Sequence, residues 1–277
     1  MIVNLTSILK DARLGKYAIG SFNVYSYETI KGVIESAIKL NKPTIVAFGE
    51  RYLENMDFDS VYATVNALGK NTNTPIALHL DHCKSFEHIV QAIRAGFTSV
   101  MYDGSNLSFE ENIKETKKIV SIAHSVNVSV EAELGGISLG DRSNEEEREQ
   151  IYTDPNEAEI FVKETGVDAL AVSIGTVHGM YKGEPKIDIG VLKSIASRID
   201  IPLVLHGGSG TPENIIKECI RNGICKINVN TEISAYTVDK IKEALRSDKD
   251  YHLSKISILE IEYIKEVVEK YMNMFYS

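Results

Sequence analysis

The sequence predicts a single (β/α)8 TIM barrel, and three observations lead to this fold class. Eight short apolar segments alternate with eight segments of helical periodicity along the chain. No linker rich in proline, glycine or serine divides the 277 residues. Two consecutive open sheets would also alternate strands with helices, but they give no reason for the number eight.

The expected strands cover residues 18–24, 43–48, 75–80, 99–102, 128–133, 169–173, 202–205 and 226–229. The expected helices cover residues 27–40, 57–70, 85–95, 109–125, 155–165, 188–198, 212–222 and 233–246. Before the first strand, the apolar spacing over residues 5–14 predicts a short helix that ends at Gly15. We interpret this helix as a plug over the base of the barrel.

Two segments exceed what a minimal barrel needs. Residues 134–151 begin with glycines and end with charges, which is typical of a lid or a disordered loop on the catalytic face. Residues 255–275 form a terminal helix with a broad apolar face, which either packs on the outer wall of the barrel or forms an oligomer contact. We therefore expect one domain over residues 1–277, with a C-terminal helical extension from about residue 248.

The composition excludes several classes of protein. Apolar residues make up 43% and charged residues 25% of the chain, as in globular proteins with a substantial core. The net charge of −9 argues against a general nucleic-acid binder. The three cysteines lack C-x-x-C spacing, so they imply no disulfide framework. The N-terminus does not resemble a signal peptide, and no apolar run could span a bilayer. We expect a cytoplasmic protein that binds neither nucleic acid nor membrane.

Three histidines come after different expected strands. These are His82, His178 and His206, and the carboxyl ends of barrel strands meet on one face, where active sites are built. Three imidazoles with an open fourth position form the ligand set of a catalytic zinc, although imidazole also suits other divalent metals. We interpret His79 as structural and expect Cys83 to point away from the site.

Glycine-rich turns predict an anion site beside these histidines. Gly207, Gly208, Ser209 and Gly210 precede Thr211 and Pro212, which we expect to be the cap and the first residue of a helix. Backbone N–H groups at such a turn bind phosphate. Asn228, Val229, Asn230 and Thr231 follow the eighth strand and supply the second half of the site. Lys182 either reaches the same anion or is a solvated surface lysine.

A metal, a phosphate and an acid together predict aldol cleavage. A divalent ion that chelates a ketone and its neighbouring hydroxyl stabilises an enediolate. Asp81, next to His82, could then move the proton of the substrate hydroxyl that becomes the aldehyde. No expected strand end presents a lysine for a Schiff base, since Lys226 is expected to begin its strand.

Seven motifs from about residue 20 to residue 235 follow an order found in one enzyme family. They are Ser21-Phe22-Asn23-Val24, Leu78-His79-Leu80-Asp81-His82, Val130-Glu131-Ala132-Glu133-Leu134-Gly135, Tyr152-Thr153-Asp154-Pro155, Gly175-Thr176-Val177-His178-Gly179, Leu205-His206-Gly207-Gly208-Ser209-Gly210 and Lys226-Ile227-Asn228-Val229-Asn230-Thr231-Glu232. On these motifs the sequence resembles the class II, zinc-dependent ketose-bisphosphate aldolases, the family of fructose- and tagatose-bisphosphate aldolases.

The resemblance implies reversible cleavage of a phosphorylated ketose, of the fructose or tagatose 1,6-bisphosphate type, to dihydroxyacetone phosphate and an aldehyde. Asp81 would be the proton donor and acceptor, and His82, His178 and His206 would bind Zn2+. Asp103 and Glu133 match positions that can hold a second or displaced metal. Dihydroxyacetone phosphate would contact the residues Asn23, Gly179, Lys182, Gly207, Gly208, Ser209, Asn228, Val229, Asn230 and Thr231. A monovalent cation, Na+ or K+, and a homodimer or homotetramer are also usual in this family.

The sequence departs from the family at three places. After Gly135, the segment 136–142 lacks the acid thought to protonate the enediolate, so that only Asp141 or the later glutamates could replace it. The turn Phe48-Gly49-Glu50-Arg51 replaces a small serine- or glycine-rich turn, and Arg51 either binds a distal anion or is a surface residue. After Thr231 the sequence diverges, and the contacts of a second phosphate are not located.

The departures leave alternatives to a bisphosphate aldolase. One is an aldolase for a different distal aldehyde, and another is a zinc- and phosphate-binding barrel that acts as a sensor or partner protein. A zinc hydrolase is a third, but such barrels usually begin with His-x-His at the first strand, where this chain has Ser21-Phe22-Asn23.

Overall fold

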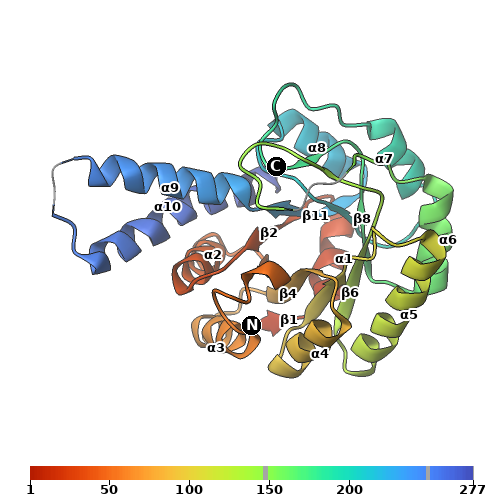
Figure 1. The fold of residues 1–277 in the computed structure, drawn as a ribbon, viewed down its shortest axis with the longest axis horizontal. Coiled ribbons are helices and arrows are strands. Elements are labelled where there is room, and N and C mark those ends of the chain that lie inside the picture. Colours follow the sequence, from red (N-terminus) through yellow and green to blue (C-terminus); the bar gives the residue numbers. More distant parts are fainter. Residues whose placement is uncertain (146–148, 248–249, 277) are drawn as a thin grey trace.

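Parallel strands close into a barrel in the computed structural model, which describes residues 1–145, 149–247 and 250–276 (Figure 1). The strands pair in the order β1-β4-β3-β2-β11-β10-β8-β6-β5, and β5 pairs again with β4. The barrel strands are β2 (Ile19–Asn23), β3 (Thr44–Gly49), β4 (Ile76–Cys83), β5 (Ser99–Tyr102), β6 (Ser129–Leu134), β8 (Ala169–Val172), β10 (Leu203–Leu205) and β11 (Ile224–Val229). The predicted barrel of eight strands is confirmed.

Helices surround the barrel and follow its strands. They are α2 (Tyr27–Leu40), α3 (Phe58–Gly69), α4 (Phe86–Ala95), α5 (Phe109–Ser125), α6 (Pro155–Thr165), α7 (Ile189–Ala196), α8 (Glu213–Arg221) and α9 (Thr231–Leu245). A short 3-10 helix, η1 (Glu50–Tyr52), lies between β3 and α3. Each predicted helix is present, with ends that differ by a few residues.

Two predicted boundaries are wrong in ways that affect the site. Lys226 does not begin its strand, because β11 begins at Ile224 and carries Lys226 as its third residue. Helix α8 has Pro212 as its N-cap instead of Thr211. The hydroxyl of Thr211 donates to the carbonyl of Gly207 at 3.1 Å, so it supports the glycine turn and does not cap the helix.

The N-terminal helix α1 (Leu5–Gly15) closes the base of the barrel, as predicted. Leu5, Ile8, Leu9 and Ala12 are buried in a cluster separate from the main core, together with the inward-facing residues Ile19, Ile45, Ala77, Ala169, Ala171, Val204 and Cys225. Before this helix, β1 (Ile2–Val3) pairs in parallel with Ile76 and Ala77. The sequence did not predict this strand, since two residues show no periodicity.

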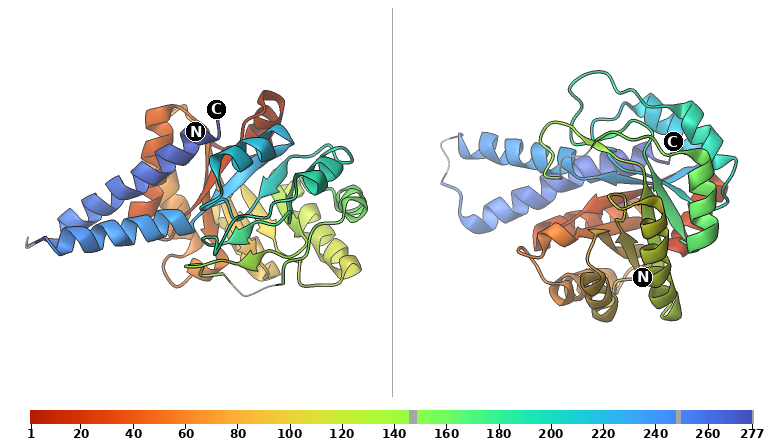
Figure 2. Two further views of the ribbon diagram at one scale, coloured as in Figure 1. Left: turned by 90° about the horizontal axis from the view of Figure 1, so that it is seen from above. Right: turned by 45° about the vertical axis from the view of Figure 1, so that its right-hand side comes forward.

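Helix α10 (Leu253–Met274) runs beside α9, and the pair projects from one side of the barrel (Figures 1 and 2). The second half of α10 packs on α2, where a Cβ atom at Gly32 would lie 2.6 Å from Ile264. The backbone of Ala18, just before β2, donates to the carbonyl of Phe275 at 3.1 Å. The expected extension is thus a helix on the outer wall of the barrel; residues 248–249 and 277 lie outside the described residues.

Between β6 and α6, the described part of segment 134–151 is ordered by backbone pairing. Strand β7 (Ser138–Leu139) pairs in parallel with β9 (Val177–His178). Antiparallel bridges join Gly136 to Ile151 and Asp141 to Met180. The expected lid therefore rests on the segment that carries His178. None of the helices in the described part of the chain has the length and apolar content that a membrane span requires.

The plug helix allows a matched test of the barrel base. We expect Leu9→Ala to lower the free energy of unfolding by about 2–5 kcal/mol, because Leu9 is fully buried and its loss leaves a cavity. Leu14→Ala in the same helix is the control, with an expected change within about 0.5 kcal/mol, because Leu14 is 77% exposed. Urea unfolding measures both, and equal effects would contradict the plug.

Candidate active site

Polar side chains from most of the barrel strands converge on a cavity at the carboxyl ends of the strands. The cavity is lined by Asn23, Asp81, His82, Asn144, Glu145, His178, Gly179, Gly207, Ser209, Asn228, Asn230 and Thr231. Ten of these twelve residues are predicted site residues. The exceptions, Asn144 and Glu145, come from the long loop after β6.

An irregularity at the end of β4 brings Asp81 and His82 to the same mouth. Consecutive residues of a regular strand point to opposite faces. Here the pairing of β4 with β5 shifts between Leu80 and Cys83, and His82 has a φ of 98°. A positive φ is uncommon outside glycine and is enriched at functional sites. This conformation turns the side chain of His82 toward the cavity that Asp81 already faces.

Two asparagines from neighbouring strands hold the carboxylate of Asp81. Asn23 of β2 donates to Oδ2 at 2.8 Å, and Asn228 of β11 donates to Oδ1 at 3.0 Å. Burial alone would raise the pKa of Asp81, but the positive charges of His82 and Lys226 outweigh burial and lower it. Asp81 is therefore an oriented carboxylate on the floor of the cavity.

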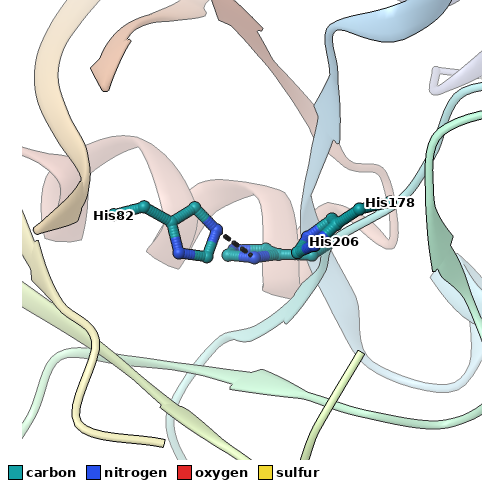
Figure 3. A group of neighbouring side chains, drawn as sticks. All are labelled: His82, His178 and His206. Carbon is teal, nitrogen blue, oxygen red and sulfur yellow. Dashed lines mark hydrogen bonds between the residues drawn. The ribbon is translucent and has the colours of Figure 1, made fainter. Parts of the chain in front are cut away.

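The three predicted metal ligands come together. Each of His82, His178 and His206 offers one nitrogen, and these atoms all lie within 4.8 Å of one another. Figure 3 shows the ring of His82 pointing toward the rings of His206 and His178, with His82 Nε2 2.8 Å from His206 Nδ1. Within the part of the chain that the structure describes, these three side chains form the group that could hold a metal ion. Three imidazoles with an open fourth position fit zinc. Cys83 does not belong to it, since its thiol donates to the carbonyl of Ser85.

Carboxylates behind the imidazoles select which nitrogens face the centre. Asp103 lies 3.3 Å from Nδ1 of His82, which leaves Nε2 to the centre. Glu131 lies 3.0 Å from Nε2 of His206, which leaves Nδ1 to the centre. Carboxylates in these positions orient metal-binding histidines. Glu133 lies 3.2 Å from the inward-facing Nδ1 of His206, whereas Asp103 contacts the outward nitrogen of His82.

The electrostatic field between the imidazoles favours a positive charge. Burial opposes the charged form of His82, but Asp81, Asp103, Glu133 and Glu145 outweigh it and raise its pKa to about 10. Burial and His82 likewise oppose the charged form of His206, yet hydrogen bonds to Glu131 and Glu133 raise its pKa. The carboxylates that stabilise these protons would also stabilise a divalent cation. The protons must leave when the cation binds.

Beneath the histidines, Lys226 and Glu131 form an ion pair inside the barrel. The ammonium of Lys226 donates to both carboxylate oxygens of Glu131 at 2.8 and 2.9 Å, and both side chains are fully buried. Burial raises the pKa of Glu131, but Lys226 and His206 outweigh it and lower it to about 2. His79 completes the layer, bonded to Ser99 at 2.9 Å, and burial and Lys226 lower its pKa to about 3. The structural role predicted for His79 fits this position.

The predicted phosphate-binding turns lie beside the histidines, and two of their positions require glycine for steric reasons. Gly207 has a φ of 73°, and a Cβ atom there would lie 2.2 Å from the carbonyl of Val177. Gly179 has a φ of 122°, and a Cβ atom there would lie 2.7 Å from the carbonyl of Asp141. A side chain at Gly207 would therefore push apart the segments that carry His178 and His206, and one at Gly179 would push the segment of His178 away from Asp141.

Three predicted substrate contacts do not line the cavity. The backbone N–H of Gly208 donates to the carbonyl of Asn228 at 2.9 Å, and the side chain of Val229 is buried in the main core. The side chain of Lys182 is 73% exposed, and its ammonium lies 3.5 Å from Asp141.

The structure adds residues that the sequence did not indicate, and it brings one of the glutamates after Asp141, Glu145, to the cavity. Asn144 and Glu145 reach the cavity from a loop without periodicity. The hydroxyl of Tyr271 on α10 donates to Glu232 and accepts from the backbone of Gly210 at 3.2 Å. The terminal helix thus supports the glycine turn, a contact between segments about sixty residues apart.

Known proteins that are similar to this chain are aldolases. The family described as fructose-bisphosphate aldolase class-II matches residues 3–277. The chain belongs to this family. A fructose-bisphosphate aldolase of Staphylococcus epidermidis is 41% identical over 256 residues, which cover 91% of this chain and 88% of the relative.

Solved structures of aldolases have the same fold. The YdjI aldolase of Escherichia coli K12 matches with a TM-score of 0.89 at 34% identity, over 99% of this chain and 97% of that one. Fructose-bisphosphate aldolase of Campylobacter jejuni matches with a TM-score of 0.84 over 99% of this chain and 95% of that one; at 24% identity it supports the fold alone. The protein is thus a class II aldolase, a lyase that cleaves a phosphorylated ketose. The alternatives of a sensor protein and a zinc hydrolase are set aside.

The ion pair below the aldolase site permits a stability test. We expect Lys226→Met to lower the free energy of unfolding by about 3–5 kcal/mol, because it leaves the buried carboxylate of Glu131 without its counter-charge. The double variant Lys226→Met/Glu131→Gln removes that charge and should regain part of the loss. Chemical unfolding of the double variant and of the two single variants, Lys226→Met and Glu131→Gln, measures the coupling. A double variant whose loss of stability equals the sum of the two single losses would contradict it.

Proposed function

We propose that this aldolase depends on zinc and uses Asp81 to move a proton between the substrate and the enzyme. The observation that carries the proposal is the position of Asp81, which is held by two asparagines beside a cluster of three histidines. His82, His178 and His206 would hold the ion. When bound there, zinc supplies a Lewis acid that polarises the ketone carbonyl of the substrate.

Asp81 would act on the hydroxyl that becomes the aldehyde. In the cleavage direction its carboxylate accepts the proton of the C4 hydroxyl while the bond between C3 and C4 breaks. The electron pair of that bond stays on C3. Because Asn23 and Asn228 occupy one oxygen each, they fix the plane of the carboxylate and leave its remaining lone pairs for the substrate.

A second acid must return a proton to C3, and Glu145 suits this role better than Asp141. Glu145 lines the cavity and is close enough to His82 to raise its pKa. Asp141 is 61% exposed and faces Lys182. We propose that Glu145 gives its proton to C3 in cleavage and takes it back in condensation.

The phosphate of dihydroxyacetone phosphate would lie against Gly179, Gly207, Ser209, Asn230 and Thr231. These residues line one part of the cavity, and Thr231 begins α9, so the N-terminus of a helix faces the phosphate. The names of the curated relatives favour fructose 1,6-bisphosphate as the substrate. Tagatose 1,6-bisphosphate and ketoses with another distal group remain part of the proposal.

The family resemblance adds two further expectations. A monovalent cation near the phosphate would make cleavage depend on Na+ or K+ at constant ionic strength. A homodimer or homotetramer would give two or four times the chain mass of 30.7 kDa in light scattering.

Variants of the acid and of one ligand should separate chemistry from metal binding. We expect Asp81→Ala to lower kcat by roughly 100- to 10,000-fold while zinc stays bound, because the general base is lost and the ligands remain. His178→Ala should lose zinc as well as activity. Kinetics and metal analysis of both proteins test this, and an Asp81→Ala enzyme with full activity would reject the role of Asp81.

A substrate panel tests the reaction itself. We expect chelator to stop the release of dihydroxyacetone phosphate from the best phosphorylated ketose, and added zinc to restore it. A coupled assay with fructose and tagatose 1,6-bisphosphates and ketose 1-phosphates would measure the release. Cleavage that persists after the metal has been removed would overturn the zinc mechanism.

A further inference from the structure

The 3-10 helix η1 (Glu50–Tyr52) joins three parts of the active-site mouth that are distant in sequence. It follows β3 directly, at the turn where the sequence departs from the family pattern. Its three side chains together contact the segment after β4, the loop after β6 and the end of β11. The mechanism proposed above gives none of them a role.

Glu50 fixes η1 to the segment that follows the metal ligand His82. Its carboxylate accepts from the backbone of Lys84 at 3.0 Å and lies 2.5 Å from Nδ1 of His88. Burial would raise the pKa of Glu50, but these hydrogen bonds outweigh it and lower it, so the carboxylate stays charged. The position of η1 is therefore set by the end of strand β4.

Tyr52 connects η1 to the opposite side of the mouth. Its side chain is 8% exposed and packs against Tyr25, with ring centroids 5.0 Å apart. Its hydroxyl accepts from the amides of Asn144 and Asn230, each at 3.0 Å. One buried oxygen thus joins the long loop after β6 to the end of β11.

Arg51 holds the loop residue that we assign as the second acid. One guanidinium nitrogen donates to the carbonyl of Asn144, and the other pairs with the carboxylate of Glu145. The side chains of Arg51 and Glu145 are 28% and 20% exposed, so this pair is more shielded than another ion pair of the loop, Arg142 with Asp239, at 58% and 46%.

We propose that Arg51 and Tyr52 form a latch that holds residues 144–145 over the active-site mouth and positions Glu145 for proton transfer at C3. The proposal rests on the function proposed above. Arg51 is a positioning residue, because it acts through Glu145 and does not line the cavity. In the structure the guanidinium of Arg51 contacts Asn144 and Glu145 of the loop, which the sequence did not predict.

Deuterium exchange into dihydroxyacetone phosphate isolates the step. In D2O and without aldehyde, the carboxylate of Glu145 takes a proton from the hydroxymethyl carbon of dihydroxyacetone phosphate, which corresponds to C3 of the ketose. The electron pair of the C–H bond stays on the substrate. The acid then exchanges its proton with solvent and returns a deuteron to C3. NMR follows the incorporation of deuterium, and the concentration dependence of its rate gives the apparent affinity for the substrate.

We expect Arg51→Met to slow exchange by roughly 10- to 100-fold with little change in substrate affinity, since displacement of a catalytic group by about 1 Å costs this much. Arg51→Lys should be intermediate, because a lysine keeps the charge but cannot bond to both loop residues. Tyr52→Phe should also slow exchange, because the phenyl ring leaves Asn144 without its acceptor.

Arg142→Met is the matched control in the same loop. It removes the exposed ion pair with Asp239 and should change exchange by less than about twofold. Zinc content and the unfolding midpoint of each variant should equal those of the wild type. If Arg51→Met does not fold, Arg51→Lys and Tyr52→Phe still decide the question.

Combination with Glu145→Gln distinguishes positioning from direct contact with the substrate. If Arg51 acts through Glu145, the double variant Arg51→Met/Glu145→Gln exchanges no more slowly than Glu145→Gln alone. A full additional loss in the double variant, or wild-type exchange in Arg51→Met, would overturn the latch. A wild-type protein that shows neither exchange nor zinc-dependent ketose cleavage would instead overturn the proposed function.

Discussion

At the end of β4 the backbone of His82 adopts a φ of 98°, and the whole site depends on this conformation. A regular strand would direct either Asp81 or His82 into the cavity, but not both. The pairing with β5 shifts between Leu80 and Cys83, and this irregularity lets Asp81 and His82 face the same cavity. A strained conformation of this kind persists only where the surroundings hold it. Here the hydrogen bonds of Asp81 to two asparagines and of His82 to Asp103 and His206 do so.

Charge is balanced in layers along the barrel axis. The plug helix closes an apolar base, and Lys226 and Glu131 lie in the layer above it as a neutral pair. The same carboxylate of Glu131 orients the ring of His206, and its negative charge is compensated by Lys226. Nearer the mouth, Asp81, Asp103, Glu133 and Glu145 raise the pKa of His82, and Glu131 and Glu133 raise that of His206. The negative field of these carboxylates therefore lies at the place where a cation is needed.

The sequence predicts features that repeat with a strand or helix period, and the structure confirms these. Because parallel strands end on one face of a barrel, the strand ends alone predict that four residues meet there. These are Asp81, His82, His178 and His206. Contacts between distant segments leave no such pattern. Glu145 lies in a loop without periodicity, the two residues of β1 are too few to show alternation, and the interior position of Lys226 depends on where β11 begins. These features follow from the closure of the barrel.

The contact of helix α10 with the glycine turn has a consequence for the order in which the protein matures during its synthesis. Domains fold as their segments leave the ribosome, N-terminal parts first. The backbone of Ala18, just before β2, donates a hydrogen bond to the carbonyl of Phe275, and the backbone of Gly210 donates one to Tyr271. A nascent chain with all its barrel strands would therefore still lack this support of the glycine turn. These two contacts therefore form only after the last helix has been made, so the glycine turn gains its final support at the end of synthesis.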